Sequence, residues 1–213
     1  MNSYLIYSDN TVNPTQYKLK NNITQTIELS NANPTAIFNG ALNVMTASSG
    51  GGMCGVKNGV YEIDGNIYSN HYCGFVGESM DKTIIRPKAG FNDNTIFRYW
   101  DGQNSQNPLT GFKLKNLKLE LNVNNATDAA WISSGSKDLE LDRVWVYSKK
   151  PPAISRIGFF IDNGNGTNNN HNLKIYNCRF EGSCLDQDML GLGNVYYGDV
   201  SHNLFLNNTA QAL

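Results

Sequence analysis

Phe112-Lys-Leu-Lys-Asn-Leu-Lys-Leu119 is a strand-like segment that decides the fold, because close variants of it recur in the second half of the chain. The variants occupy residues 139–146, 173–180 and, more loosely, 198–205. The positions that we take as equivalent in the four copies are Asn116, Arg143, Asn177 and His202. They are spaced by about 27, 34 and 25 residues, which is typical of stacked repeat proteins. The sequence therefore predicts a solenoid.

Within each copy, apolar residues alternate with polar ones, as at Leu114 between Lys113 and Lys115. The alternation shifts by one at the equivalent position, so each copy is expected to form two short strands that meet at a bend. A further apolar run precedes each copy, at residues 96–100, 131–132, 158–161 and 189–192. About three strands per repeat are therefore expected, and their apolar positions can be buried only against neighbouring coils.

Stacking the copies in register predicts two outward columns of side chains. The first column alternates in charge at a strand spacing of ~4.8 Å and consists of Lys113, Glu140, Lys174 and Asp199. The second places an indole between two cations and consists of Lys118, Trp145, Arg179 and Leu204. Both columns have a structural explanation, because cross-strand pairs stabilise sheets.

The earlier coils carry further motifs, Asn58-Gly-Val-Tyr-Glu-Ile63 and Gly74-Phe-Val-Gly-Glu-Ser-Met-Asp-Lys-Thr-Ile-Ile-Arg86. Together with the corners at Asn177-Cys178 and His202-Asn203, they resemble the right-handed parallel β-helix proteins of the pectate-lyase-like superfamily. In that superfamily a Gly-x-Tyr strand precedes a Gly-x-Gly-like turn and a Thr-Ile-Ile strand, and here Glu78 replaces the second glycine.

The resemblance covers residues 55–208. It implies an all-β fold, a single-stranded right-handed parallel β-helix of about 5–6 coils. We expect an N-terminal arm and cap over residues 1–48 and the β-helix over residues 49–213. Residues 1–33 read as an arm or added strands, and residues 34–46 as a short helix that could cap the open end of the core. The same architecture serves lyases, hydrolases, epimerases, adhesins and viral tailspikes, so it indicates the fold more narrowly than the activity.

Composition argues against two classes of partner. The chain of 213 residues has 16 % charged residues and a net charge of −1, which gives no field that would attract nucleic acid or a membrane surface. No apolar run approaches the ~20 residues of a membrane span, and residues 4–7 are too short for a secretory signal. We expect an extracellular protein, exposed on a cell surface or a virion.

The cysteines argue against a zinc site, because Cys54, Cys73, Cys178 and Cys184 have no C-x-x-C spacing. Cys178 occupies an inward position and is expected to act as a small apolar residue. A bridge between Cys54 and Cys73 is left open, because spacing alone does not establish disulfide geometry.

The acidic residues that could carry chemistry are Asp186 and Asp188, with Asp162 about one coil earlier. Residues two apart in an extended segment face the same side, so stacking could gather the three carboxylates. They could act as the acid and base of a glycoside hydrolase. Alternatively, Asp186 and Asp188 could hold calcium in a polysaccharide lyase. The structural alternative is a solvated turn.

Each enzyme hypothesis lacks a component. The resemblance implies that a hydrolase would also carry a Gly-His-Gly turn and an Arg-x-Lys strand downstream of the acidic residues, and neither follows Asp188 in this sequence. A lyase needs a basic residue beside the acids, and Arg156 and Arg179 are candidates only by their proximity in the repeat.

Two functional hypotheses follow. The first is a non-catalytic surface or virion β-helix that binds a polysaccharide or cell-surface glycan, or assembles with neighbouring subunits as a homo-oligomer or filament. Its expected contacts are Trp100, Trp131, Trp145, Arg179, Tyr196 and Tyr197. The alternative is a lyase or hydrolase that acts on an acidic polysaccharide through Asp162, Asp186 and Asp188, with calcium as its cofactor if it is a lyase. The missing basic partner favours the first hypothesis, which requires no cofactor.

Overall fold

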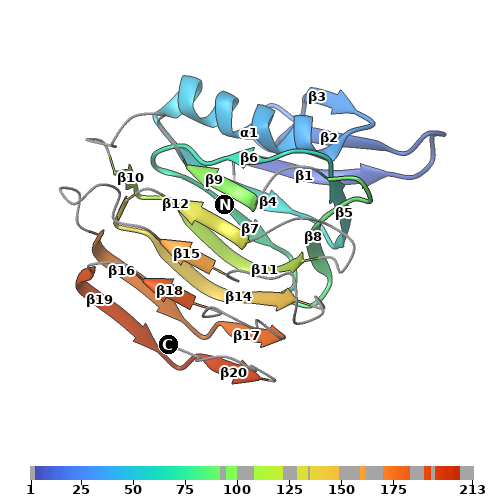
Figure 1. The fold of residues 1–213 in the computed structure, drawn as a ribbon. Coiled ribbons are helices and arrows are strands. Elements are labelled where there is room, and N and C mark those ends of the chain that lie inside the picture. Colours follow the sequence, from blue (N-terminus) through green and yellow to red (C-terminus); the bar gives the residue numbers. More distant parts are fainter. Residues whose placement is uncertain are drawn as a thin grey trace.

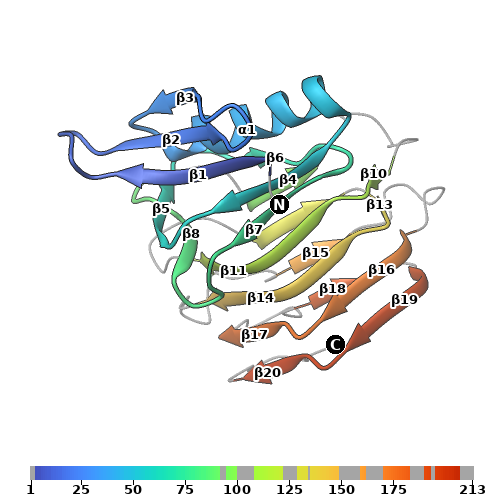
Figure 2. The same ribbon diagram turned by 180° about the vertical axis from the view of Figure 1, so that it is seen from behind.

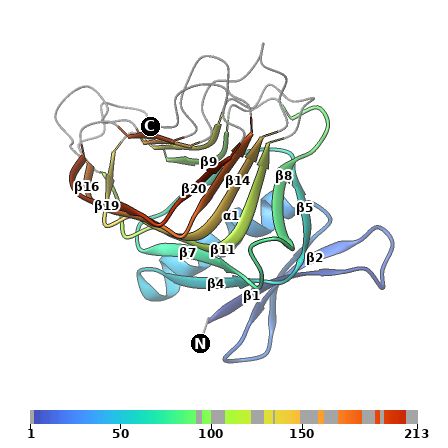
Figure 3. The ribbon, with the colours of Figure 1, turned by 90° about the horizontal axis from the view of Figure 1, so that it is seen from below.

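The structure, a computed structural model, describes residues 3–91, 95–99, 108–121, 129–133, 135–148, 159–161, 170–182, 190–192 and 195–206. Its strands form one 15-stranded and one 5-stranded sheet. Successive coils stack along one axis, and their strands superpose when the molecule is viewed from below (Figure 3). Among the described residues there is one helix, α1.

The smaller sheet consists of the apolar runs that precede each repeat. Its strands pair in parallel in the order β6 (Ile67–Tyr68), β9 (Thr95–Tyr99), β12 (Ala129–Ser133), β15 (Phe159–Ile161) and β18 (Leu190–Leu192). Each of these strands lies in a different coil. The predicted additional strand in each repeat is thereby confirmed.

The larger sheet contains the repeated segments, whose strands again pair in parallel with those of the neighbouring coils (Figures 1 and 2). Its strands before the bend are β4 (Gly52–Val56), β7 (Cys73–Gly77), β10 (Leu109–Thr110), β13 (Ser136–Lys137), β16 (Asn170–Tyr176) and β19 (Val195–Ser201). Two strands run through the bend, β11 (Lys113–Leu121) and β14 (Glu140–Ser148). The strands after it are β5 (Gly59–Ile63), β8 (Thr83–Pro87), β17 (Arg179–Gly182) and β20 (Leu204–Leu206).

The bend in each repeat is a single residue with left-handed backbone, and we call this position the main corner. Asn116, Arg143, Asn177 and His202 have φ angles of 54°, 54°, 55° and 55°. One such residue turns the chain and reverses which side chains face inward, which explains the shift in the alternation. The Asn116 side chain also donates a hydrogen bond to the carbonyl of Gly77, 3.0 Å away in the preceding coil.

A second corner, which we did not predict, lies five residues before the main one. The left-handed residues there are Tyr72, Gly111, Asp138, Asn172 and Tyr197, with φ angles of 56°, 69°, 55°, 53° and 59°. Backbone hydrogen bonds connect this region from coil to coil, for example from Gly111 N to the carbonyl of Lys137 at 2.8 Å. The second corner therefore forms a continuous column along the stack.

Both predicted outward columns are confirmed by the strand register. Lys113 pairs with Glu140, Glu140 with Lys174, and Lys174 with Asp199. In the other column, Lys118 pairs with Trp145, Trp145 with Arg179, and Arg179 with Leu204. The repeats are therefore aligned as the sequence indicated.

The core between the sheets contains a chain of aromatic rings. Phe75 contacts Phe38 of the helix with ring centroids 5.2 Å apart and Phe97 of the smaller sheet at 6.1 Å. Phe97 in turn contacts Phe112 at 6.1 Å, and Phe38 contacts Tyr61 at 5.5 Å. All five rings are fully buried. Ring packing therefore connects the helix to the first coils.

The N-terminal strands extend the larger sheet. They are β1 (Tyr4–Asp9), β2 (Gln16–Asn21) and β3 (Ile27–Asn31). Adjacent members pair antiparallel, while β1 pairs in parallel with β4. Residues 3–33 thus contribute added strands, one of the two forms expected for the N-terminal segment.

Helix α1 (Pro34–Ser49) lies across the N-terminal end of the stack (Figure 1). Asn33 caps it by accepting a hydrogen bond from Thr35 N at 2.9 Å, and Pro34 suits its first turn. The helix continues beyond the predicted residue 46, because Gly50 is the residue that provides the left-handed cap, with φ 65°. Its buried apolar residues are Ile37, Phe38, Ala41, Leu42 and Met45. The cap expected over the core is therefore present.

The described cysteines do not form disulfides. Cys54, Cys73 and Cys178 are buried free thiols, and Cys184 lies outside the described residues. Burial raises the pKa of Cys178 to about 12, as expected for a thiol that packs as an apolar group. Within the described ranges, no helix is long and apolar enough to cross a membrane.

Candidate ligand-binding groove

Several predicted site residues lie outside the residues that the structure describes. These are Asp162, Asp186, Asp188 and Trp100. Trp131 lies in β12, but its side chain is not among those described. The acidic cluster and its calcium role therefore stay predictions.

Trp145 and Arg179 lie together after the main corner, on what we call the Trp145 face. The Lys118 ammonium lies 4.1 Å from the indole centroid and the Arg179 guanidinium carbon 4.4 Å from it. Because these cations come from the strands on either side of β14, they cover both faces of the ring. Lys118 is only 7 % exposed and also pairs with Glu120 at 2.9 Å. These contacts leave the edge of the indole, rather than a face, for a sugar.

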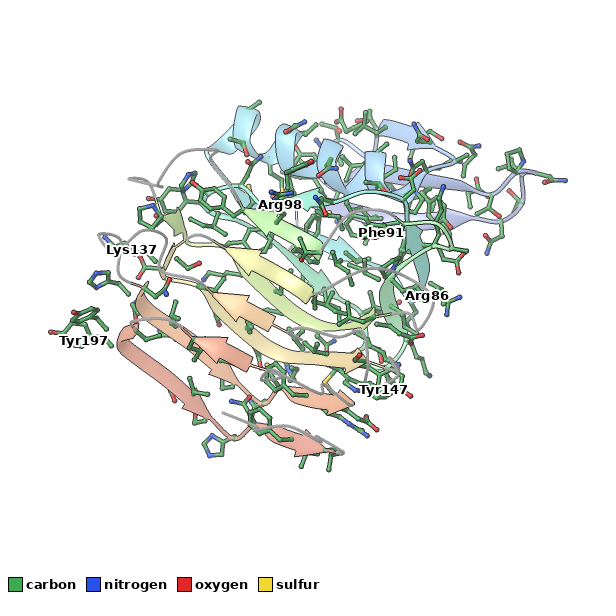
Figure 4. The ribbon with its side chains drawn as sticks, in the orientation of Figure 1. Arg86, Phe91, Arg98, Lys137, Tyr147 and Tyr197 are labelled. Carbon is green, nitrogen blue, oxygen red and sulfur yellow. The ribbon has the colours of Figure 1, made fainter. Side chains whose placement is uncertain are left out.

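Tyr196 and Tyr197 lie at the opposite end of the larger sheet. Their exposed fractions are 49 % and 86 %, and Tyr196 stacks on His171 with ring centroids 5.4 Å apart. Figure 4 shows Tyr197 and Tyr147, which neighbours Trp145 at 5.7 Å, at opposite edges of the molecule. The predicted aromatic contacts therefore separate into two groups.

A groove of about 310 Å³ lies on the tyrosine side, and we call it the corner groove. It is lined by Tyr72, Gly111, Lys113, Asp138, Leu139, Glu140, Asn172 and Lys174. These residues come from the second corner and from the charged column immediately after it. The coil stacking thus brings together residues that are up to about one hundred positions apart in the sequence.

Glycine shapes one wall of the corner groove. A Cβ atom at Gly111 would lie 2.7 Å from Cδ1 of Tyr72, so only glycine allows the tyrosine ring to lie against the backbone here. The positive φ of Gly111 also favours glycine. Tyr72 is 60 % exposed and therefore offers an accessible ring at the groove.

Glu140 is the electrostatic centre of the groove. Its carboxylate lies 3.1 Å from Lys113 Nζ and 2.6 Å from Lys115 Nζ, and it accepts a hydrogen bond from the Tyr176 hydroxyl at 2.6 Å. Burial alone would raise its pKa, but these three donors outweigh burial and lower the pKa to about 2. Donation to Glu140, reinforced by burial, raises the pKa of Tyr176 to about 12. At neutral pH the carboxylate is ionised and the phenol is neutral.

Two other lysines of this region differ from Lys113 and Lys115 in their ionic contacts. Within the described residues, Lys174 and the exposed Lys137 form no ion pair within 4.0 Å. Lys137 lies on the same side of the molecule as Tyr197 (Figure 4). The neighbouring Asp138 instead accepts a hydrogen bond from Asn172 Nδ2 at 2.7 Å. The two ammonium groups are thus available to an anionic ligand.

The groove is better suited to binding than to acid–base catalysis. A carboxylate whose pKa is about 2 is a weak base, and the Tyr176 proton is held by that carboxylate. The described residues also contain no group of three or more His, Cys, Asp or Glu side chains that could hold a metal ion. The described lining therefore offers hydrogen-bonding groups, charges and one aromatic ring.

Glu140→Gln is expected to lower the free energy of unfolding at pH 7 by about 1–2 kcal/mol, a value reduced for solvent screening of the partly exposed lysines. Folding lowers the pKa of Glu140 from 4.5 to about 2, so its contribution is present above pH 4.5 and disappears as the pH falls toward 2. Urea denaturation of both proteins at several pH values measures this. A difference that persists unchanged at the lowest pH would contradict the charge-based explanation.

Sequence reasoning missed the second corner and therefore the corner groove. A signal was present, because Gly111, Asp138 and Asn172 each stand five residues before a main corner and belong to types that tolerate left-handed backbone. Lys113, Glu140 and Lys174 were identified as a structural column but not as part of a site. The groove becomes visible only when both columns are placed side by side.

Comparisons with solved structures show what the fold resembles. The A-module of the Azotobacter vinelandii mannuronan C-5 epimerase AlgE4 matches with a TM-score of 0.59 and 17% identity, over 84% of this chain and 47% of that one. The A-module of the epimerase AlgE6 from the same organism matches with a TM-score of 0.55 and 15% identity, over 83% and 51%. The chain therefore spans about half the length of these modules. No protein-family model and no curated protein matches.

This likeness confirms the predicted fold, a right-handed parallel β-helix. The number of coils stays a prediction.

Proposed function

We propose that this β-helix protein binds a polysaccharide along the corner groove. The observation that supports this most strongly is a groove that crosses successive coils and is lined by the exposed ring of Tyr72 together with Lys113 and Lys174. Flat rings suit the apolar faces of sugars, and ammonium and amide groups suit their oxygens. Tyr72, Tyr196 and Tyr197 provide the rings, and Lys113, Lys174 and Asn172 the polar contacts.

The bound chain runs across the strands, parallel to the axis of the coil stack. Tyr72 and Tyr197 stand four coil steps apart in the second corner, a distance of about 19 Å at the usual strand spacing. A glycan laid in this direction contacts one coil after another and meets a tyrosine near each end. An extended polymer therefore fits the groove better than a single sugar.

The proposed ligand is acidic. Glu140 is already neutralised by Lys113 and Lys115, which leaves Lys174 and Lys137 to face carboxylate groups of the glycan. Such a role suits a protein exposed outside the cell or on a virion, as we expect for this chain.

The second candidate function is a carbohydrate-active enzyme. It is favoured by the likeness to the two modules described above, which are from mannuronan C-5 epimerases. In that case the predicted Asp162, Asp186 and Asp188 would supply the chemistry, and the corner groove would position the polymer. Product analysis separates the candidates, because a binding protein leaves the length and composition of the polysaccharide unchanged.

Titration calorimetry with acidic and neutral polysaccharides tests the binding function. We expect saturable binding of an acidic polymer and a loss of about threefold to fivefold in affinity for Lys174→Gln, the range for one partly exposed charge. Lys82→Gln is the matched control, because Lys82 is also exposed but does not line the groove. Equal weakening by both substitutions, or no binding to any polysaccharide, would contradict the proposal.

A further inference from the structure

His71 lies in the segment that joins β6 to β7, immediately before Tyr72 of the corner groove. Its Nδ1 accepts a hydrogen bond from the backbone N of Thr110 at 3.1 Å, and its Nε2 lies 3.2 Å from the hydroxyl of Tyr99. The Tyr99 ring also packs edge-on against the imidazole, with ring centroids 5.5 Å apart. The imidazole therefore connects Tyr99 of β9 to Thr110 of β10.

The contact with Thr110 determines which nitrogen of the neutral ring carries the proton. A backbone N–H group can only donate, so Nδ1 of His71 is unprotonated. The proton of the neutral ring is then on Nε2, from which it is donated to the oxygen of Tyr99. Protonation of the ring would place a second N–H group against the Thr110 donor. The observed contact therefore requires a neutral His71.

The same segment holds one wall of the corner groove. Tyr72 N donates to the carbonyl of Thr110 at 2.7 Å, so residues 71 and 72 engage both backbone groups of Thr110. The next residue, Gly111, lies against the Tyr72 ring. Tyr72 has a φ angle of 56°, a conformation that a tyrosine keeps only where neighbouring contacts maintain it. The hydrogen bond between His71 and Thr110 is one such contact beside this wall.

We propose that His71 is a positioning residue of the corner groove, and that its protonation weakens the binding of an acidic polysaccharide. This inference rests on the proposed function and adds its regulation by pH. The neutral ring holds Thr110 and thereby the wall formed by Tyr72 and Gly111. The protonated ring loses that hydrogen bond, and the Tyr72 ring is released from its place at the groove. Because the binding form needs the unprotonated ring, the affinity rises with pH.

The other ionisable groups near His71 do not reproduce this effect. Those of the surrounding elements are Tyr72, Cys73, Arg98, Tyr99, Lys137 and Asp138. Between pH 5 and pH 8 histidine is the side chain whose charge ordinarily changes. Burial raises the pKa of the Cys73 thiol, which keeps it neutral in this range. Among the described residues, His71 forms no ion pair within 4.0 Å.

A second histidine near the groove has an effect of the opposite sign. His171 stacks on Tyr196 with ring centroids 5.4 Å apart. A positive charge on His171 would attract an acidic polymer, so its protonation strengthens binding at low pH. The contribution of His71 is therefore measured as the difference between the wild-type protein and a His71 variant.

Titration calorimetry with polygalacturonate at pH 8 and pH 5 tests the effect on binding. Compared with His71→Asn, the wild-type protein should lose about fivefold more affinity at pH 5, the size usual for one hydrogen bond. His71→Asn should bind within about twofold of wild type at pH 8, because the amide oxygen accepts from Thr110 N and does not titrate. His71→Ala has no acceptor and should bind about fivefold more weakly at pH 8.

His202→Asn is the matched control for His71→Asn. His202 is exposed at a main corner, does not line the groove, and has a left-handed backbone that asparagine tolerates. This variant should keep the wild-type affinity at both pH values.

NMR of the ligand-free protein separates a failure of this inference from a failure of the proposed function. At pH 8 the nitrogen shifts of the His71 ring should identify the tautomer with its proton on Nε2. As the pH falls to 5, the amide shifts of Tyr72, Thr110 and Gly111 should change together with those of the His71 ring. In His71→Asn these amides should not respond.

Three results would overturn the inference. The first is a His71 ring whose proton is on Nδ1, and the second is a set of amides at residues 72, 110 and 111 that do not follow its titration. The third is a pH dependence of binding that is the same in wild type and His71→Asn. If the NMR results are as expected and polygalacturonate binds at neither pH, the effect on binding fails together with the polysaccharide function. The positioning of Tyr72 and Gly111 by His71 would then stand alone.

Discussion

Phe75→Ala is expected to lower the free energy of unfolding by about 3–5 kcal/mol, the cost usual for removing a buried phenylalanine ring. Phe75 is fully buried and contacts both Phe38 and Phe97. Its loss therefore leaves a cavity and also separates α1 from the ring contacts that extend into the coils. Because the rings pack edge-on, the remaining side chains cannot close the space without moving the helix.

Urea denaturation followed by circular dichroism measures this change. Val76→Ala is the matched control, because Val76 is the next residue of β7 and only partly buried. It should lower the free energy of unfolding by about 1 kcal/mol or less. If the two substitutions destabilise the protein equally, the aromatic core does not have the role that we assign to it.

Tyr72→Ala should weaken polysaccharide binding by about thirtyfold, which corresponds to the ~2 kcal/mol typical of an aromatic hot spot. The ring lines the corner groove, is 60 % exposed, and is held against Gly111. It is therefore already placed to contact a sugar, and little conformational freedom is lost on binding.

Tyr68→Ala is the matched control for Tyr72→Ala. Tyr68 is 57 % exposed but lies in β6 of the smaller sheet and does not line the groove. Tyr72→Asn is a second variant, because asparagine tolerates the left-handed backbone at this position while removing the ring. Calorimetry should show weak binding for both Tyr72 variants and unchanged binding for Tyr68→Ala. Similar losses for Tyr68 and Tyr72 would point to a general effect of surface aromatics.

Much of the fold could be predicted because the repeated segments share one pattern and must align with one another in the stack. The segment 112–119 has the pattern of two short strands joined by a bend. The opposite charges of Lys113 and Glu140 indicate how the copies align. The bend was visible as a shift in alternation, since one left-handed residue reverses the direction of the side chains. These signals are local or repeat at regular intervals, so they can be read from one sequence.

The groove could not be predicted in the same way. Tyr72 belongs to none of the repeated segments, and tyrosine is not a residue type that favours the left-handed conformation that it adopts here. The contact between Tyr72 and Gly111 joins residues 39 positions apart, which is longer than the intervals between the repeated segments. For Trp145, the sequence did predict the flanking cations, but the distances were needed to show that they cover both ring faces.

The position of a bound acidic oligosaccharide, mapped by amide chemical shifts on the folded protein, tests the proposed function most directly. The groove hypothesis predicts that the largest changes occur at Tyr72, Gly111, Asp138, Asn172 and Lys174, with little change at Trp145 and Arg179. Changes confined to the Trp145 face, or to the segments that carry Asp162, Asp186 and Asp188, would contradict it.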